Sequence, residues 1–179
     1  EIVNLKWLGK ISTSMINQNQ KRKSEILNWY VPFRNSIFIT LALALAESRM
    51  INNKEVNEIY IGIKYEGDLR FKDTTPEFIR QMNKIASFSE QKNFKIKAPF
   101  LNKDKEDIIS LAKKMNLNLE NSFSCYLNKE KHCGKCAGCL SRKKGFKFSQ
   151  IKESTKYKDP LYRLPSEAKR GSRLRDTKP

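Results

Sequence analysis

The amino-acid sequence predicts an α/β fold built on a parallel sheet. Segments typical of strands alternate with segments typical of helices between residues 3 and 148, an order that favours this class. Residues 56–63 (VNEIYIGI) are almost continuously apolar and β-branched, as inner strands of parallel sheets are. A length of 179 residues with 39% hydrophobic content is enough for one domain with a substantial core.

The chain begins with a weak strand pattern. Val3, Leu5 and Trp7 alternate with polar residues, which predicts a short strand that ends at Gly9. Residues 12–24 (STSMINQNQKRKS) are polar and have no period, so we expect a loop there.

A strongly apolar helix is predicted next. Residues 36–47 are apolar on nearly every side, and such a helix is expected to be buried all round. Pro32 precedes it and Asn35 is its predicted N-cap. Arg34 and Asn35 therefore lie at the positive end of a helix, where either anion binding or plain capping would explain them.

The rest of the α/β pattern follows the strand at 56–63. Gly62 lies near the carboxyl end of that strand, where open α/β sheets bind ligands. Pro76 is suited to the first position of a helix, and apolar residues recur at helical spacing after residue 103. The remaining predicted elements are a polar loop at 64–75, a helix at 77–88, a strand at 94–98, a helix at 103–115 and a closing helix at 141–148.

All four cysteines of the chain lie in one short stretch, with the spacing C-x7-C-x2-C-x2-C: Cys125, Cys133, Cys136 and Cys139. Two overlapping C-x2-C turns can direct their sulfurs to one centre, which predicts a tetrahedral, structural Zn²⁺ site within a loop at 125–142. Gly134 and Gly138 are expected to supply the positive φ values of the turns, and Arg142 a nearby cation that favours thiolates.

Two other chemistries fit the same cysteines. Two disulfides are one alternative, but the lysine-rich chain shows no signal-peptide pattern and is expected to keep its thiols reduced. A redox or iron–sulfur site is the other. Four protein ligands leave no open coordination position, so the predicted zinc would hold a loop and not perform chemistry.

The charge of the chain is unevenly distributed. The formal net charge is +17, and residues 140–179 alone contain 13 Lys or Arg against 4 Asp or Glu. We expect residues 149–179 to form an extended basic tail after a folded part at 1–148, with either a solvated surface or nucleic-acid binding as its role. The longest apolar run, residues 37–46, is about half of what spans a bilayer, so a soluble, cytoplasmic protein without a membrane partner is predicted.

Several motifs together resemble the 7-cyano-7-deazaguanine synthase family. They are VPFRN with the helix ending in LALAE, IYIGI, TPEF, KEDI, SCY and CGKCAGCLSRKKGF, and they occur in that family's order between residues 5 and 148. The resemblance implies an adenine nucleotide α-hydrolase-like (ATP pyrophosphatase) fold. It also implies an ATP- and Mg²⁺-dependent ligase that converts 7-carboxy-7-deazaguanine and ammonia to the nitrile precursor of queuosine, and a homodimer.

The resemblance also implies site residues. Arg34 and Asn35 match the VPxRN active-site loop, and Lys105 matches the lysine that opens the K-x-E-I helix motif, so these three are the candidate catalytic residues. Asp73 matches the aspartate before PEF, and Phe71 keeps an aromatic position in the same loop, so both are candidate substrate contacts. By the same match, the four cysteines are zinc ligands.

Two departures from the family pattern bear on function. The glycine-rich Ser-Gly-Gly-x-Asp-Ser loop that wraps the ATP pyrophosphate is not found, so we expect the amino-terminal part of the fold to be missing and catalysis to require an amino-terminal partner segment. The loop at 68–75 (DLRFKDTT) differs from the family's SGYPDCR-like sequence. Two alternatives therefore remain: a diverged homologue in a bacterial defence pathway that attaches a deazaguanine or other carboxylate to a different acceptor, and a non-catalytic zinc-stapled subunit or nucleic-acid-binding module.

Overall fold

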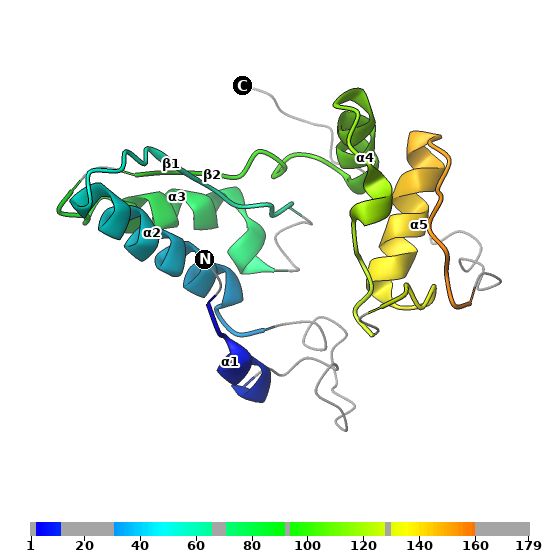
Figure 1. The fold of residues 1–179 in the computed structure, drawn as a ribbon, viewed down its shortest axis with the longest axis horizontal. Coiled ribbons are helices and arrows are strands. Elements are labelled where there is room, and N and C mark those ends of the chain that lie inside the picture. Colours follow the sequence, from blue (N-terminus) through cyan, green and yellow to red (C-terminus); the bar gives the residue numbers. More distant parts are fainter. Residues whose placement is uncertain (1–2, 12–30, 66–70, 92–93, 128–129, 160–179) are drawn as a thin grey trace. The chain divides into compact units, whose positions relative to one another are not determined.

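The computed structural model describes residues 3–11, 31–65, 71–91, 94–127 and 130–159 (Figure 1). The chain forms two compact units, Glu1–Asp104 and Lys105–Pro179. The predicted loop at 12–24, the first part of the loop at 68–75 and the basic residues after 159 lie outside the described residues.

The first unit contains a parallel strand pair, which confirms the predicted α/β class. Strand β1 (Glu58–Tyr60) pairs with β2 (Lys95–Lys97), and Ile59 lies opposite Ile96 in the register. Both strands are shorter than predicted. Side chains alternate along a strand, so Ile59 and Ile96 are buried while Tyr60 is 62% exposed on the opposite face. Among the described residues, β1 pairs with β2 alone, so the inner-strand position that its composition predicts is not seen there.

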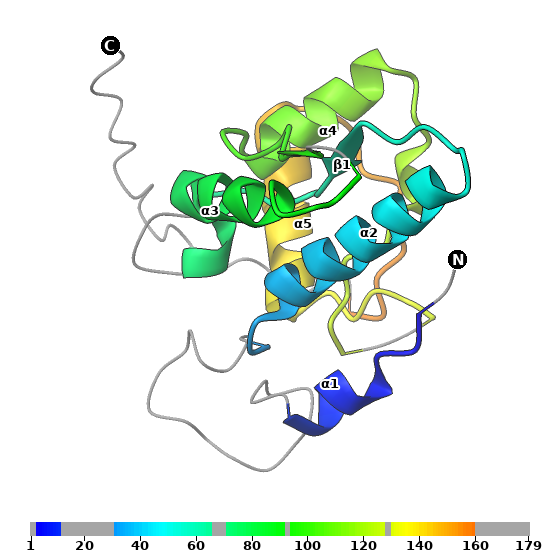
Figure 2. The ribbon, with the colours of Figure 1, turned by 90° about the vertical axis from the view of Figure 1, so that its left-hand side faces the viewer.

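Two helices cover the buried face of the strand pair (Figures 1 and 2). They are α2 (Arg34–Ile51) and α3 (Pro76–Ala86), and α3 begins at Pro76 with Thr75 as its N-cap. The hydroxyl of Thr75 accepts a hydrogen bond from the Phe78 N–H over 3.1 Å. The core of this unit consists of Ile39, Ala46, Ile59, Met82, Ala86, Phe94 and Ile96.

Helix α2 differs from its prediction in two respects. It begins at Arg34, and Phe33, in the left-handed conformation with φ 51°, occupies the N-cap position predicted for Asn35. The helix is also buried along one stripe only, since Phe38 and Leu41 are 44% and 36% exposed. Its apolar composition therefore does not make it a fully buried helix within the described part of the chain.

The predicted amino-terminal strand is wrong. Residues 6–11 form the helix α1 (Lys6–Ile11). The side chain of Asn4 accepts a hydrogen bond from the Lys6 N–H over 3.1 Å, and the Leu8 N–H donates to the Leu5 carbonyl oxygen over 3.0 Å. A side-chain bond of this kind favours the start of a helix over an extended chain, and three alternating apolar residues are too short a pattern to oppose it.

The second unit is built on two helices joined by the cysteine loop. Helix α4 (Lys105–Lys114) packs against α5 (Ala137–Ser149), and a short 3₁₀ turn, η4 (Leu119–Asn121), follows α4. The helices approach closely at Gly145, where an added Cβ would lie 2.5 Å from Cγ of Lys105 and 2.8 Å from Cδ1 of Ile109. Helix α5 begins four residues earlier than predicted and so includes Cys139.

Residues 151–159, assigned by sequence to the basic tail, are extended and pack on the second unit through Tyr157. Among the described residues, no helix has both the length and the apolar character needed to cross a membrane.

Asn83 of α3 occupies the edge of β2 that faces away from β1. Its amide nitrogen donates to the Ile96 carbonyl oxygen over 3.0 Å, and its amide oxygen accepts from the Ile96 N–H over 2.9 Å. Because Lys95 bonds to β1 through the Asn57 carbonyl oxygen, Ile96 is directed toward the other edge. One amide side chain thus makes both hydrogen bonds that a neighbouring strand would make there.

We expect Asn83→Ala to lower the free energy of unfolding by about 1–3 kcal/mol, because it leaves the N–H and carbonyl groups of Ile96 without these partners. Urea unfolding followed by circular dichroism measures the change. The control is Lys84→Ala on the exposed side of the same helix, which should stay within about 0.5 kcal/mol of the unmodified protein. Equal losses from both variants would contradict the role of Asn83.

Candidate functional site

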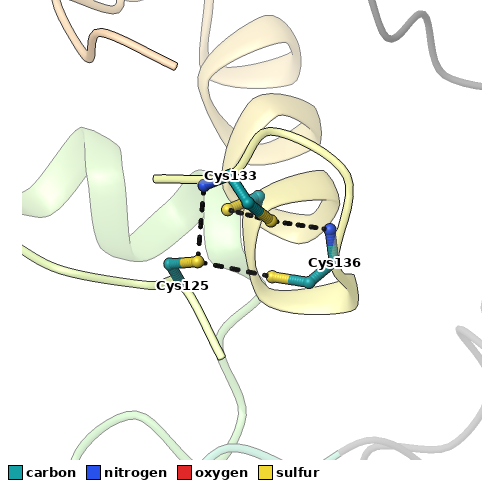
Figure 3. Close-up of side chains that lie close together, drawn as sticks. Cys125, Cys133 and Cys136 are labelled. Carbon is teal, nitrogen blue, oxygen red and sulfur yellow. Dashed lines mark hydrogen bonds between the residues drawn. The ribbon is translucent and has the colours of Figure 1, made fainter. Parts of the chain in front are cut away.

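The four cysteines form one buried cluster, as the spacing predicts. Figure 3 shows Cys125, Cys133 and Cys136 close together. Their sulfur atoms all lie within 4.8 Å of one another. The Cys133–Cys139 and Cys125–Cys136 sulfur separations are 3.9 and 4.0 Å. A tetrahedral ion with bonds of about 2.3 Å needs sulfur separations of about 3.8 Å, so the cluster fits Zn²⁺. All four cysteines are free, and these separations are about twice a disulfide bond length, so the disulfide alternative is wrong for this structure.

Backbone groups orient the sulfurs of the cluster. The Cys133 N–H donates to the sulfur of Cys125 over 3.4 Å, and the Cys136 N–H donates to the sulfur of Cys133 over 3.3 Å (Figure 3). Gly134 has the expected positive φ of 85°, whereas Gly138 does not and lies within α5. A Cβ at Gly138 would lie 2.0 Å from the Ser124 carbonyl oxygen, so that glycine allows a close approach of backbones and not a left-handed turn.

An added cation would determine whether the sulfurs of the cluster are thiols or thiolates. Burial raises the pKa of the Cys139 thiol well above its usual range, so burial alone would keep it neutral. Cys136 is the N-cap of α5 and Cys139 lies in its first turn, where the helix dipole favours thiolates. A bound dication would favour the thiolate form, and metal binding would release protons.

Arg142 does not serve the thiolates as the sequence predicted. Its side chain is 6% exposed, and Nε donates to Glu153 over 2.9 Å and to Thr155 over 3.0 Å. Its other nitrogens donate to the hydroxyl of Ser122 over 2.6 Å and to the Leu119 carbonyl oxygen over 3.0 Å. The guanidinium group thus joins α5, the turn before the cysteine loop and the segment at 151–159.

His132, the only histidine of the chain, supports the loop. It is buried, and its Nε2 accepts a hydrogen bond from the Ser124 N–H over 3.0 Å. Burial lowers the pKa of His132, and the nearby charge of Arg142 lowers it further. The ring packs on Phe123 at a centroid distance of 4.6 Å. A neutral, buried imidazole that accepts a backbone hydrogen bond is a structural group in this loop.

A second cluster of candidate residues lies in the first unit, at the start of α2. The side chain of Asn35 is buried, and its amide nitrogen donates to the Asp73 carbonyl oxygen over 3.0 Å. Asp73 lies in the 3₁₀ turn η3 (Lys72–Thr74), and Phe71 is the residue before this turn. The structure thus brings together Asn35 and Asp73, which are 38 residues apart in the sequence.

The two charged candidates lie at helix starts. Arg34, the first residue of α2, is exposed, and its Nε donates to the side-chain oxygen of Asn35 over 3.4 Å. Lys105 is the first residue of α4, in the second unit, and its stem lies against Gly145. Sequence reasoning missed Glu153 and Tyr157, whose only signal was the recurrence of lysine at alternate positions, Lys152, Lys156 and Lys158.

Comparison with known proteins gives the family of the chain. The family described as queuosine biosynthesis protein QueC matches residues 1–150. Three of the curated relatives that carry the name 7-cyano-7-deazaguanine synthase show the extent of the similarity. The protein from Methanobrevibacter smithii is 30% identical over 173 residues, which cover 89% of this chain and 74% of the relative. The protein from Campylobacter jejuni subsp. doylei is 39% identical over 131 residues, and that from Nautilia profundicola is 38% identical over 131 residues. These alignments cover 72% of this chain in both cases, and 56% and 57% of the two relatives.

The last two alignments span little more than half the length of those relatives. The family match covers most of this chain and includes the motifs that carry the resemblance. The chain therefore belongs to the QueC family of queuosine biosynthesis proteins.

Proposed function

We propose that this chain acts as a 7-cyano-7-deazaguanine synthase, which uses ATP and ammonia to convert 7-carboxy-7-deazaguanine to its nitrile. Membership of the QueC family and the names of the curated relatives support this activity. The geometric observation that supports it most is the hydrogen bond from Asn35 to the Asp73 backbone. It joins two segments that the family resemblance assigns to one active site.

The proposed reaction activates the same carbon atom twice. The substrate carboxylate attacks the α-phosphorus of ATP and releases pyrophosphate, and ammonia then displaces AMP to give an amide. The amide oxygen attacks a second ATP in the same way, and loss of AMP and two protons leaves the nitrile. Every step changes the charge on phosphate oxygens, so the site needs cationic groups and hydrogen-bond donors.

Each candidate residue has a proposed part in this chemistry. Arg34 would contact phosphate; it is the first residue of α2, and anions bind readily at helix starts. Asn35 fixes the turn that carries Asp73, and Asp73 binds the substrate. Phe71 stacks on the deazaguanine ring. For Lys105, the family resemblance alone suggests that it would neutralise phosphate charge, and Mg²⁺ bound with ATP would share that task.

We also propose that the four cysteines hold one structural Zn²⁺ ion. The sulfur separations and the burial of all four ligands support this choice. Four protein ligands would leave no position for water or substrate, so the ion would stabilise the loop between α4 and α5. Residues 1–148 would then form the enzymatic part of the chain, and the basic residues beyond 159 a separate tail.

We expect one zinc ion per chain by mass-spectrometric metal analysis, and its loss in Cys136→Ser. Loss of a ligand should also abolish hydrogen-exchange protection across residues 125–142, because metal binding and folding of this loop are coupled. Lys135→Ala, an exposed neighbour of the same ligand, is the control and should retain full zinc. Iron in place of zinc, or full zinc in Cys136→Ser, would contradict the proposed site.

We expect zinc-loaded protein, supplied with an amino-terminal partner segment that carries the pyrophosphate loop, to form the nitrile from ATP, Mg²⁺, ammonia and 7-carboxy-7-deazaguanine. Mass spectrometry detects the product. Asn35→Ala should lower kcat/KM at least tenfold, since the Asp73 turn loses its buried partner. Thr40→Ala, on the exposed side of the same helix, should leave kcat/KM unchanged.

Two outcomes of this experiment would favour a different function. A conjugate of the deazaguanine with another acceptor, and no nitrile, would favour a diverged ligase. No product of either kind, together with nucleic-acid binding that weakens steeply as salt rises, would favour a binding module instead.

A further inference from the structure

Residues 151–159 form an extended segment, hereafter the strap, with two distinct faces. Burial alternates along the strap: Glu153, Thr155 and Tyr157 are half-buried, whereas Lys152, Ser154, Lys156 and Lys158 are exposed. This period of two is that of an extended chain lying on a surface. The family match ends at residue 150, so the strap lies just beyond it.

The inward face of the strap is tied to the cysteine loop at three points. Glu153 accepts from the buried Arg142 over 2.9 Å and from the hydroxyl of Tyr157. The Lys158 N–H donates over 2.9 Å to the carbonyl oxygen of His132, the residue before a metal ligand. The ring of Tyr157 lies 5.7 Å from that of His132, edge to face.

The strap also lies directly against the loop that carries two of the sulfurs. Tyr157 packs on the buried cysteine cluster, and the ammonium group of Lys143 lies 4.4 Å from the centre of its ring. Gly134, between Cys133 and Cys136, has no space for a side chain, since a Cβ there would lie 2.4 Å from the Asp159 carbonyl oxygen. The loop cannot open toward this side unless the strap moves.

We propose that the strap is a clasp that controls how fast the cysteine cluster exchanges its metal. The inference rests on the proposed zinc site. A ligand must leave the ion before a chelator or water can replace it, and here that movement also requires loss of the Tyr157 packing and of the hydrogen bond to His132. Contacts just outside the ligands commonly change metal affinity 10- to 100-fold.

The test is the rate at which the zinc-loaded protein transfers its metal to the chromogenic chelator 4-(2-pyridylazo)resorcinol under native conditions. We expect Tyr157→Ala to accelerate transfer at least tenfold and Glu153→Gln to accelerate it by a smaller factor. Tyr157→Phe keeps the ring and should stay nearer to the unmodified protein. Lys156→Ala, an outward-facing change on the same strap, is the matched control and should match the unmodified rate.

The outcomes separate the clasp from the metal site itself. Unmodified protein that carries no zinc would overturn both proposals. Zinc-loaded Tyr157→Ala that transfers metal within twofold of the Lys156→Ala rate would overturn the clasp alone. Should Tyr157→Ala not fold, Tyr157→Leu, which keeps apolar bulk but loses the ring and hydroxyl, provides the same comparison.

Discussion

The second unit depends on bringing four sulfur atoms within 4.8 Å of one another inside the protein. As thiols they offer each other only weak hydrogen bonds, and as thiolates they repel. A shared dication would remove this conflict, because it would stabilise the charged form that burial opposes. The turn after η4, the cysteine loop and the first turn of α5 meet at this point, so the four sulfurs join three successive parts of the second unit.

Elsewhere the fold is held by buried polar side chains that join distant segments. Arg142 connects α5 to the turn before the loop and to the strap, and Asn35 connects α2 to η3. Arg142 has several hydrogen-bond partners and Asn35 has a backbone partner, as buried polar groups require. These hydrogen bonds hold the segments in more specific positions than apolar packing does, since a hydrogen bond constrains direction as well as distance.

Local patterns in the sequence were sufficient for much of this structure. Cysteine spacing predicted the cluster, Pro76 predicted the start of α3, and apolar runs predicted the parallel strands. The misses have two causes. At the amino terminus, the hydrogen bond to the Asn4 side chain favours a helix where three alternating apolar residues predicted a strand. Local patterns also do not show what lies beside a helix, so they did not predict that Phe38 is exposed. The partners of Arg142 and Asn35 are 11 to 38 residues away, beyond the reach of any periodicity.

The amide of Asn83 has a consequence for self-association. An unpaired strand edge invites addition of a strand from another molecule, which is a common route to aggregation. At Ile96 both edge groups of β2 are already bonded to a side chain from a covering helix. A foreign strand would have to displace that amide first, so the sheet is protected from growth in this direction even though it contains only two short described strands.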